Sequence, residues 1–202
     1  MLVSNNKVLK INNKWLNTFD PYNIQGVVIG DKIWSKPNLM IDDGGEGIYY
    51  VDDVTIDGVN YGRQYYYNWY AAARVAAKVG NGWRLPTWSD WDSLALTIGG
   101  YYQGNKLKST TGWYKSTTGE YFNGTDDYGL TIYPFHNHDS LGYGVTAEFH
   151  AGDRPSGDGG MTNGVYDVLF QTSSNWQIGR EYSGEDAGNT LYKQVRLVKD
   201  VV

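Results

Sequence analysis

The sequence predicts an α+β fold in which two helices pack on small, twisted antiparallel sheets, with long loops between the elements. Two segments show the spacing of apolar residues that is typical of helices. The chain contains 26 Gly, 18 Tyr and 8 Trp among 202 residues, and the helix-favouring residues Leu, Glu and Lys are scarce. This composition favours short strands and ordered loops around the two helices.

The first helix is predicted over residues 65–79, and Gly80 is expected to end it. Apolar residues recur there at steps of three and four positions: Trp69, Ala72, Ala73, Ala76 and Val79. Because most of these side chains are small, this face can approach another element closely.

The second helix is predicted to begin after Thr87, which is a favourable N-cap residue preceded by Pro86. Asp90 stands at the position of a capping box. The buried side of the helix is expected from four residues that precede the Gly99-Gly100 pair: Trp88, Trp91, Leu94 and Ala95.

Short apolar segments bounded by turn-forming residues predict the strands. Residues 27–34 are expected to form two strands around Gly30-Asp31, and residues 48–51 another strand after an acidic glycine loop. Residues 193–198 alternate polar and apolar side chains, which predicts a half-buried strand.

The length fits one domain, residues 26–202, with an extension at residues 1–25. Residues 7–17 predict a hairpin that turns at Asn12-Asn13. Since an isolated hairpin is marginally stable in water, we expect it to anchor the chain to a partner or to sister subunits. A disordered leader is the alternative. The anchoring side chains would be Val8, Leu9, Ile11, Trp15 and Leu16.

Composition excludes several classes of function. The net charge of −5 gives no basic patch for nucleic acid. The absence of Cys excludes disulfides, thiolate nucleophiles and Cys-ligated zinc, and indicates maturation without an oxidising compartment. Neither an apolar signal segment nor a window of 18 apolar residues occurs. We therefore expect assembly in the cytoplasm without membrane insertion.

The sequence contains two candidate metal sites. His136 and His138, with Glu148 and His150 further on, could ligate zinc, although a solvated loop whose imidazoles make ordinary hydrogen bonds is the simpler explanation. Asp42 and Asp43 open an acidic stretch that could hold a structural calcium. The acidic spacing does not match the twelve-residue calcium loop, so no cofactor is predicted beyond that possible calcium.

Catalytic motifs are missing. The sequence has no nucleophile elbow, no phosphate-binding glycine loop with lysine and no His-Glu-x-x-His. Asp126 and Glu148 could be paired as glycosidase carboxylates, but the sequence does not give their separation. We predict that the protein is not an enzyme.

Tryptophans gather around the start of the second helix, where we expect them to pack rather than to bind a ligand. Arg84 is expected to pair with a carboxylate or to stack on one of the rings. The predicted structural motif comprises Trp83, Arg84, Pro86, Trp88, Trp91 and Trp113.

Residues 143–189 have the mixture of Gly, Ser, Asn, Tyr and Arg that adaptable binding loops use, although they could simply be the long loops of the fold. The candidate ligand-binding residues are Tyr166, Asn175, Trp176, Arg180 and Tyr182.

The order of motifs along residues 26–202 resembles the Fibrobacter succinogenes major paralogous domain. The segments that carry this resemblance are Gly30–Trp34, Pro37–Met40, Gly82–Thr87, Asp90–Leu94, Leu107–Ser109, Gly112-Trp113, Asp126–Leu130 and Val195–Asp200. The resemblance implies a C-type-lectin-like fold akin to formylglycine-generating domains. It also implies a ligand face in the C-terminal region. The cysteines or iron-binding histidines of catalytic relatives have no counterpart here, which argues against oxidase chemistry.

The leader, residues 4–16, is similar to openings of structural proteins of phages of gut bacteria. We therefore expect a non-catalytic virion protein, such as a head fibre, a capsid decoration or a tail receptor-binding subunit, whose lectin-like domain adheres to a host surface or glycan. Expected partners are the chain itself, as a homotrimer, and other virion or capsid proteins contacted through the N-terminus. A bacterial surface or secreted glycan-binding protein is the alternative.

Overall fold

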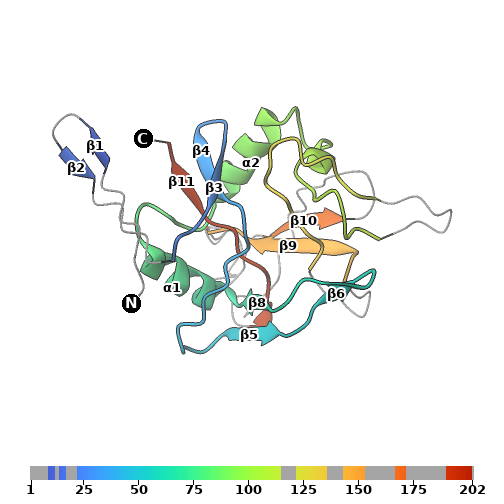
Figure 1. The fold of residues 1–202 in the computed structure, drawn as a ribbon. Helices are drawn as coiled ribbons and strands as arrows, with labels where there is room; N and C mark the ends of the chain where they lie inside the picture. The colour runs from blue at the N-terminus through green and yellow to red at the C-terminus, as the bar shows by residue number, and fades with distance from the viewer. Residues whose placement is uncertain are drawn as a thin grey trace, which may run out of the picture.

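The computed structural model describes residues 9–11, 14–16, 22–114, 122–135, 143–152, 167–171 and 190–201. Two α-helices and several small antiparallel sheets make up this part of the chain (Figure 1). The predicted α+β class, with two helices and small antiparallel sheets, is confirmed.

The leader contains two short strands. β1 (Leu9–Ile11) pairs antiparallel with β2 (Lys14–Leu16), and the register sets Leu9 opposite Leu16 and Ile11 opposite Lys14. This is the pairing that the hairpin prediction requires.

The domain begins with β3 (Gly26–Ile29) and β4 (Lys32–Ser35), which pair antiparallel. Gly30 has a φ of 65° in the connection between them, a conformation that suits glycine. β11 (Val198–Asp200) pairs with the other edge of β4, so the end of the chain lies beside the start of the domain (Figure 1).

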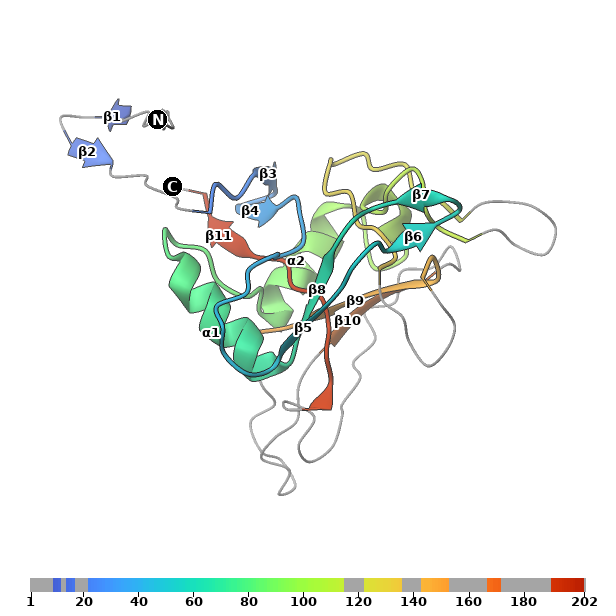
Figure 2. The ribbon, with the colours of Figure 1, turned by 60° about the horizontal axis from the view of Figure 1, so that its bottom comes forward.

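The remaining strands of the domain form three further antiparallel pairs. β5 (Ile48–Val51) pairs with β8 (Gln64–Tyr67), and the short strands β6 (Thr55–Ile56) and β7 (Val59–Asn60) lie between them in sequence. β9 (Thr146–His150) pairs with β10 (Asp167–Gln171). Single bridges join Tyr67 to Lys193 and Phe149 to Gln194, so the chain at residues 193–194 connects the β5–β8 and β9–β10 pairs (Figure 2).

Helix α1 spans Trp69–Val79 and begins later than the sequence suggested. Residues 65–67, predicted as helix, belong to β8, because three consecutive tyrosines suit a strand paired with β5. The Asn68 side chain accepts a hydrogen bond from the Ala71 N–H at 2.9 Å and caps the helix. Gly80 ends it, as predicted, with a φ of 67°.

Helix α2 spans Trp88–Thr97 and begins with the predicted capping box. The Thr87 hydroxyl accepts from the Asp90 N–H at 3.2 Å, and the Asp90 carboxylate accepts from the Thr87 N–H at 2.7 Å. A single turn of 3-10 helix, η1 (Gly104–Lys106), follows.

The prediction of a half-buried final strand was wrong. All residues from 193 to 198 are buried, and β11 starts only at Val198. Val195 and Leu197 pack in the cluster under α1, whereas Val198 packs in the cluster under α2. Because this segment runs between two cores, both of its faces are covered.

Two large hydrophobic clusters and one small one form the interior. The cluster under α2 includes Trp34, Trp91, Trp113 and Phe149, and the one under α1 includes Tyr67 and Trp83. The small cluster gathers Val54, Ile56 and Phe135 beside β6, together with half-buried tyrosines.

Candidate functional site

The tryptophan motif lies in the interior. Trp91 is fully buried 4.7 Å from Trp34, measured between ring centroids, and Trp88 packs half-buried against the same cluster. Trp83 belongs to the cluster under α1. Trp113 is buried too, and its indole N–H donates to the Ser109 hydroxyl at 3.1 Å.

Arg84 pairs with a carboxylate, the first of its two expected roles. Its two terminal nitrogens donate to the two oxygens of Asp90, and Nη1 also donates to the Leu85 carbonyl at 3.2 Å. Pro86 contributes its carbonyl, which accepts from the Gly152 N–H at 2.7 Å. These contacts fix the loop that precedes α2.

The acidic loop after β4 binds side-chain cations of α1. Asp43 accepts from Arg74 at 2.9 Å and 3.0 Å and from Lys78 at 2.7 Å. The Arg74 and Lys78 cations hold the pKa of this carboxyl well below its ordinary value. Asp42 accepts from the Gly44 N–H at 2.9 Å.

The histidine and carboxylate candidates on β9 are buried. His150 Nε2 lies 2.8 Å from the Tyr67 carbonyl oxygen, and Glu148 forms a buried ion pair with Lys193. Asp126, its possible catalytic partner, accepts from the N–H and the hydroxyl of Thr131 at 2.7 Å and 2.6 Å. Within the described ranges, no three His, Asp or Glu side chains meet as a metal site.

Several predicted residues lie outside the part of the chain that the structure describes. They are His136, His138, Tyr166, Asn175, Trp176, Arg180 and Tyr182, together with Val8 and the side chains of Leu9, Ile11, Trp15 and Leu16.

A partly exposed group of side chains on and beside β5 and β8 was missed by the sequence analysis. We call it the tyrosine ribbon, and its members are Tyr49, Tyr50, Asp52, Arg63 and Tyr65. Tyr49 and Tyr50 are 43% and 45% exposed. β5 pairs with β8 alone among the described strands and lies at the lower edge of Figure 1.

Arg63 organises one side of the tyrosine ribbon. Its guanidinium carbon lies 3.8 Å from the centroid of the Tyr50 ring, and Tyr65 lies 5.7 Å from Tyr50 between ring centroids. Arg63 donates to both oxygens of Asp52, at 2.6 Å and 3.3 Å. The hydrogen bonds to Asp52 and Tyr65 raise the pKa of Arg63 further, so it is always cationic.

On the other face of β5, the Tyr49 ring contacts two aromatic rings. It stacks on buried Tyr66 with 4.9 Å between centroids and meets the edge of Tyr192 at 5.1 Å. The sequence signal was the pair of tyrosine-rich segments at residues 48–51 and 64–67. Since the second segment was assigned to a helix, the cross-strand pairing of Tyr50 with Tyr65 was not foreseen.

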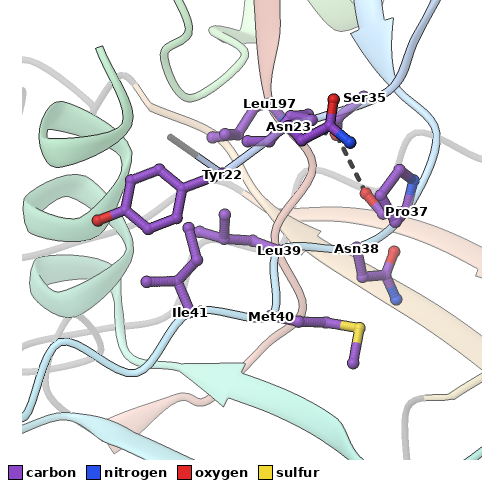
Figure 3. Close-up of a pocket in the computed structure, with 10 residues that line it drawn as sticks. Tyr22, Asn23, Ser35, Pro37, Asn38, Leu39, Met40, Ile41 and Leu197 are labelled. Carbon is purple, nitrogen blue, oxygen red and sulfur yellow. Dashed lines mark hydrogen bonds between the residues drawn. The ribbon is translucent and has the colours of Figure 1, made fainter. Parts of the chain in front are cut away.

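A small, mainly apolar pocket of about 150 Å³ lies where the leader joins the domain (Figure 3). It is lined by Tyr22, Asn23, Ile24, Ser35, Pro37, Asn38, Leu39, Met40, Ile41 and Leu197. Asn38 is only 9% exposed, and its buried side-chain oxygen accepts no hydrogen bond from the described residues. This oxygen has almost no accessible surface, so the accessible walls of the pocket are mainly apolar.

Comparison with protein families, with curated proteins and with solved structures finds no match to this chain. The resemblance drawn from the motifs therefore stays a prediction. No helix in the described ranges is both long and apolar enough to cross a membrane.

Proposed function

We propose that the chain is a non-catalytic virion structural protein that displays a lectin-like domain for adhesion to a host surface or glycan. The tyrosine ribbon carries this proposal. Tyr50, beside Arg63, and Tyr49, on the opposite face of β5, present exposed rings, and each ring is fixed by its neighbours. Rigid aromatic surface beside polar groups binds a ligand at a low cost in side-chain entropy.

The chemistry of the tyrosine ribbon suits a neutral sugar. The apolar face of a pyranose ring can stack on tyrosine, while its hydroxyls hydrogen-bond to charged neighbours. Asp52 and Arg63 supply acceptors and donors, and their mutual pairing leaves little net charge. An uncharged glycan is thus favoured over an acidic one.

The non-catalytic role is supported by the contacts of the carboxylates. Asp43, Asp90 and Glu148 each pair with a cation that the fold places beside them. Asp126 holds the backbone and hydroxyl of Thr131. These groups stabilise loops and strand contacts, which is a structural use of carboxylates.

The lectin-like fold, the trimeric state and attachment to a particle through residues 1–25 complete the proposal. The two helices on small antiparallel sheets, which the resemblance implies, support the lectin-like fold. Repetition of a weak site on one particle would raise its avidity, which supports an oligomer. Immunogold labelling of purified particles and of the producing cell envelope would decide between a virion and a bacterial surface location.

Glycan-array binding of the labelled full chain tests the adhesive site. Replacing Tyr49, Tyr50 and Arg63 by alanine should weaken binding by about tenfold or more, since buried aromatic and arginine contacts dominate such interfaces. Tyr102→Ala is the matched control, because Tyr102 is 66% exposed and lies outside the tyrosine ribbon. Equal binding by wild type and the triple variant, with unfolding temperatures unchanged, would refute this site.

A further inference from the structure

The outer edge of β3 is open. β3 pairs with β4 alone among the described strands, and β4 lies between β3 and β11 (Figure 2). The opposite edge strand, β11, is bridged to Arg84 and carries the charged residues Lys199 and Asp200. Charged side chains, prolines and covering segments normally protect an edge strand, and β3 has none of these among the described residues. A further strand can therefore be added to β3.

The hydrogen-bond pattern shows which residues of β3 face this open edge. The Gln25 carbonyl, just before β3, accepts from the Lys36 N–H at 2.9 Å. Bonded and non-bonded pairs alternate along an antiparallel register, so Val27 is bonded to β4 whereas Gly26 and Val28 are not. The N–H and C=O groups of Gly26 and Val28 thus point away from β4. No described residue forms a hydrogen bond with them there.

The side chains at this edge are apolar and differ in size. Val28 is 59% exposed, and Gly26, on the same face of the strand, has no side chain. A Cβ atom at Gly26 would lie 2.6 Å from Cγ2 of Ile33 and 3.2 Å from Cη2 of Trp83. The edge therefore presents a projecting valine next to a glycine with apolar surroundings.

We propose that β3 pairs antiparallel with β3 of a second copy, about a twofold axis that passes beside Val27. In this register each Gly26 lies opposite Val28 of the other copy, and the free N–H and C=O groups of both strands bond to one another. Each Val28 side chain packs over the glycine of the other copy. Since a twofold contact uses the same surface twice, a strand that is complementary to itself fits a second copy of this chain.

The inference goes beyond the proposed function, because the contact needs neither residues 1–25 nor the tyrosine ribbon. A pairing of this length buries little surface, so it is weak between free chains. Where one particle holds many copies, repetition strengthens the contact. We therefore expect β3 to join neighbouring copies on a common carrier.

Cysteine cross-linking tests the register, because the chain has no Cys of its own. Val27→Cys sets two thiols opposite each other, with Cα atoms about 4.5 Å apart, which a disulfide can span. Val28→Cys is the matched control, since its Cα atoms would lie about 8 Å apart, beyond the reach of a disulfide.

Non-reducing gels of the full chain, incubated with oxidised glutathione, measure the rate at which each variant forms dimer. Val27→Cys should form dimer about tenfold faster than Val28→Cys, because pairing raises the effective concentration of its thiols. Random collisions would give the opposite order, since Val27 is half-buried and Val28 is 59% exposed.

Two further substitutions disrupt the pairing in the Val27→Cys background. Val28→Pro removes an N–H that faces the open edge and keeps the bonds to β4, and edge strands tolerate proline at such positions. Val28→Lys adds a charge to the same edge and replaces the proline variant if that variant unfolds. Each should slow dimer formation about tenfold, by the loss of the raised effective concentration. Val59→Lys, at an exposed residue of β7, should leave the rate unchanged.

Three outcomes would overturn the proposal: faster cross-linking of Val28→Cys, equal rates for the two cysteine variants, or an unchanged rate with Val28→Pro and Val28→Lys. Each would leave the edge of β3 to another strand. Unfolding temperatures identify any variant with a folding defect. Because β3 contributes no residue to the tyrosine ribbon, failure here leaves the glycan-binding test intact.

Discussion

Arg84 and Asp90 form a two-point ion pair at the start of α2, with nitrogen–oxygen distances of 2.5 Å and 3.0 Å. The same carboxylate accepts the Thr87 N–H and closes the capping box. Arg84 also bridges to Val198 through its backbone. The Arg84–Asp90 pair therefore links the helix start and the preceding loop, and the Arg84 backbone joins both to the C-terminal strand.

Replacing Asp90 by asparagine should lower the free energy of unfolding by about 2 kcal/mol, since both a cap and a charged hydrogen bond are weakened. Burial alone would raise the pKa of Asp90, but hydrogen bonds from Arg84 and Thr87 outweigh it and hold the pKa below 3.8. Its stabilisation is therefore complete above 3.8 and is lost as the pH falls further.

Urea unfolding of Asp90→Asn and wild type across acidic pH checks this expectation. The difference between them should shrink as the pH falls below 3.8. Asp92→Asn, on the same helix, is the control and should change stability little. A difference that is constant with pH would show that the charge of Asp90 contributes nothing.

The start of α2 could be predicted from the sequence because every signal there is local. Thr87, Pro86 and Asp90 lie within one turn, and they act on the backbone next to them. The start of α1 was harder to predict from the sequence. Residues 65–67 fit the periodicity of a helix and that of a strand. They form a strand because they pair with residues 48–51, which are distant in the sequence.

The tyrosine ribbon and the buried final segment depend on long-range contacts. Tyr50 of β5 contacts Arg63, which directly precedes β8, a proximity that no spacing along the chain shows. Residues 193–198 alternate in sequence, yet they lie between the clusters under α1 and α2. Alternation indicates which side chains share a face but not whether the opposite face is covered.

Arg196 should be essential for stability. It is 1% exposed, and its Nη1 donates to the carbonyls of Ser35 at 2.8 Å, of Leu130 at 3.1 Å and of Lys36, while Nη2 donates to Thr131 at 3.0 Å. Arg196→Met leaves these carbonyls without their donor and should cost about 3 kcal/mol or more.

Arg196→Lys is the informative second variant. It keeps the positive charge, but an ammonium cannot span carbonyls on two segments, so it should recover little of the loss. Thermal unfolding of both variants checks this. Wild-type stability in Arg196→Met would mean that the carbonyls of residues 35 and 130 find other donors.

Calcium should not stabilise the acidic loop through Asp43. Arg74 and Lys78 already occupy its carboxylate, and a calcium ion would have to displace both. Millimolar calcium chloride and chelator should thus give the same unfolding temperature. A rise with calcium that Asp43→Asn abolishes would contradict the ion-pair assignment and support a structural calcium.

Lys108 should make the protein more stable at alkaline pH. It is 4% exposed, its ammonium lies 3.9 Å from the Trp113 ring centroid, and burial lowers its pKa to about 8 from 10.5. Between these values the unfolded chain binds more protons than the folded one, so stability rises with pH. The full gain should approach about 3 kcal/mol.

Lys108→Met removes this dependence, since the apolar side chain has nothing to titrate. Chemical unfolding should show wild type gaining stability relative to Lys108→Met as the pH rises from about 8 toward 10.5. The exposed Lys36→Met variant should run parallel to wild type over that range, which separates burial from a general effect of lost charge. If the stability of Lys108→Met also runs parallel to that of wild type, the Lys108 ammonium is equally solvated in the folded and unfolded chains.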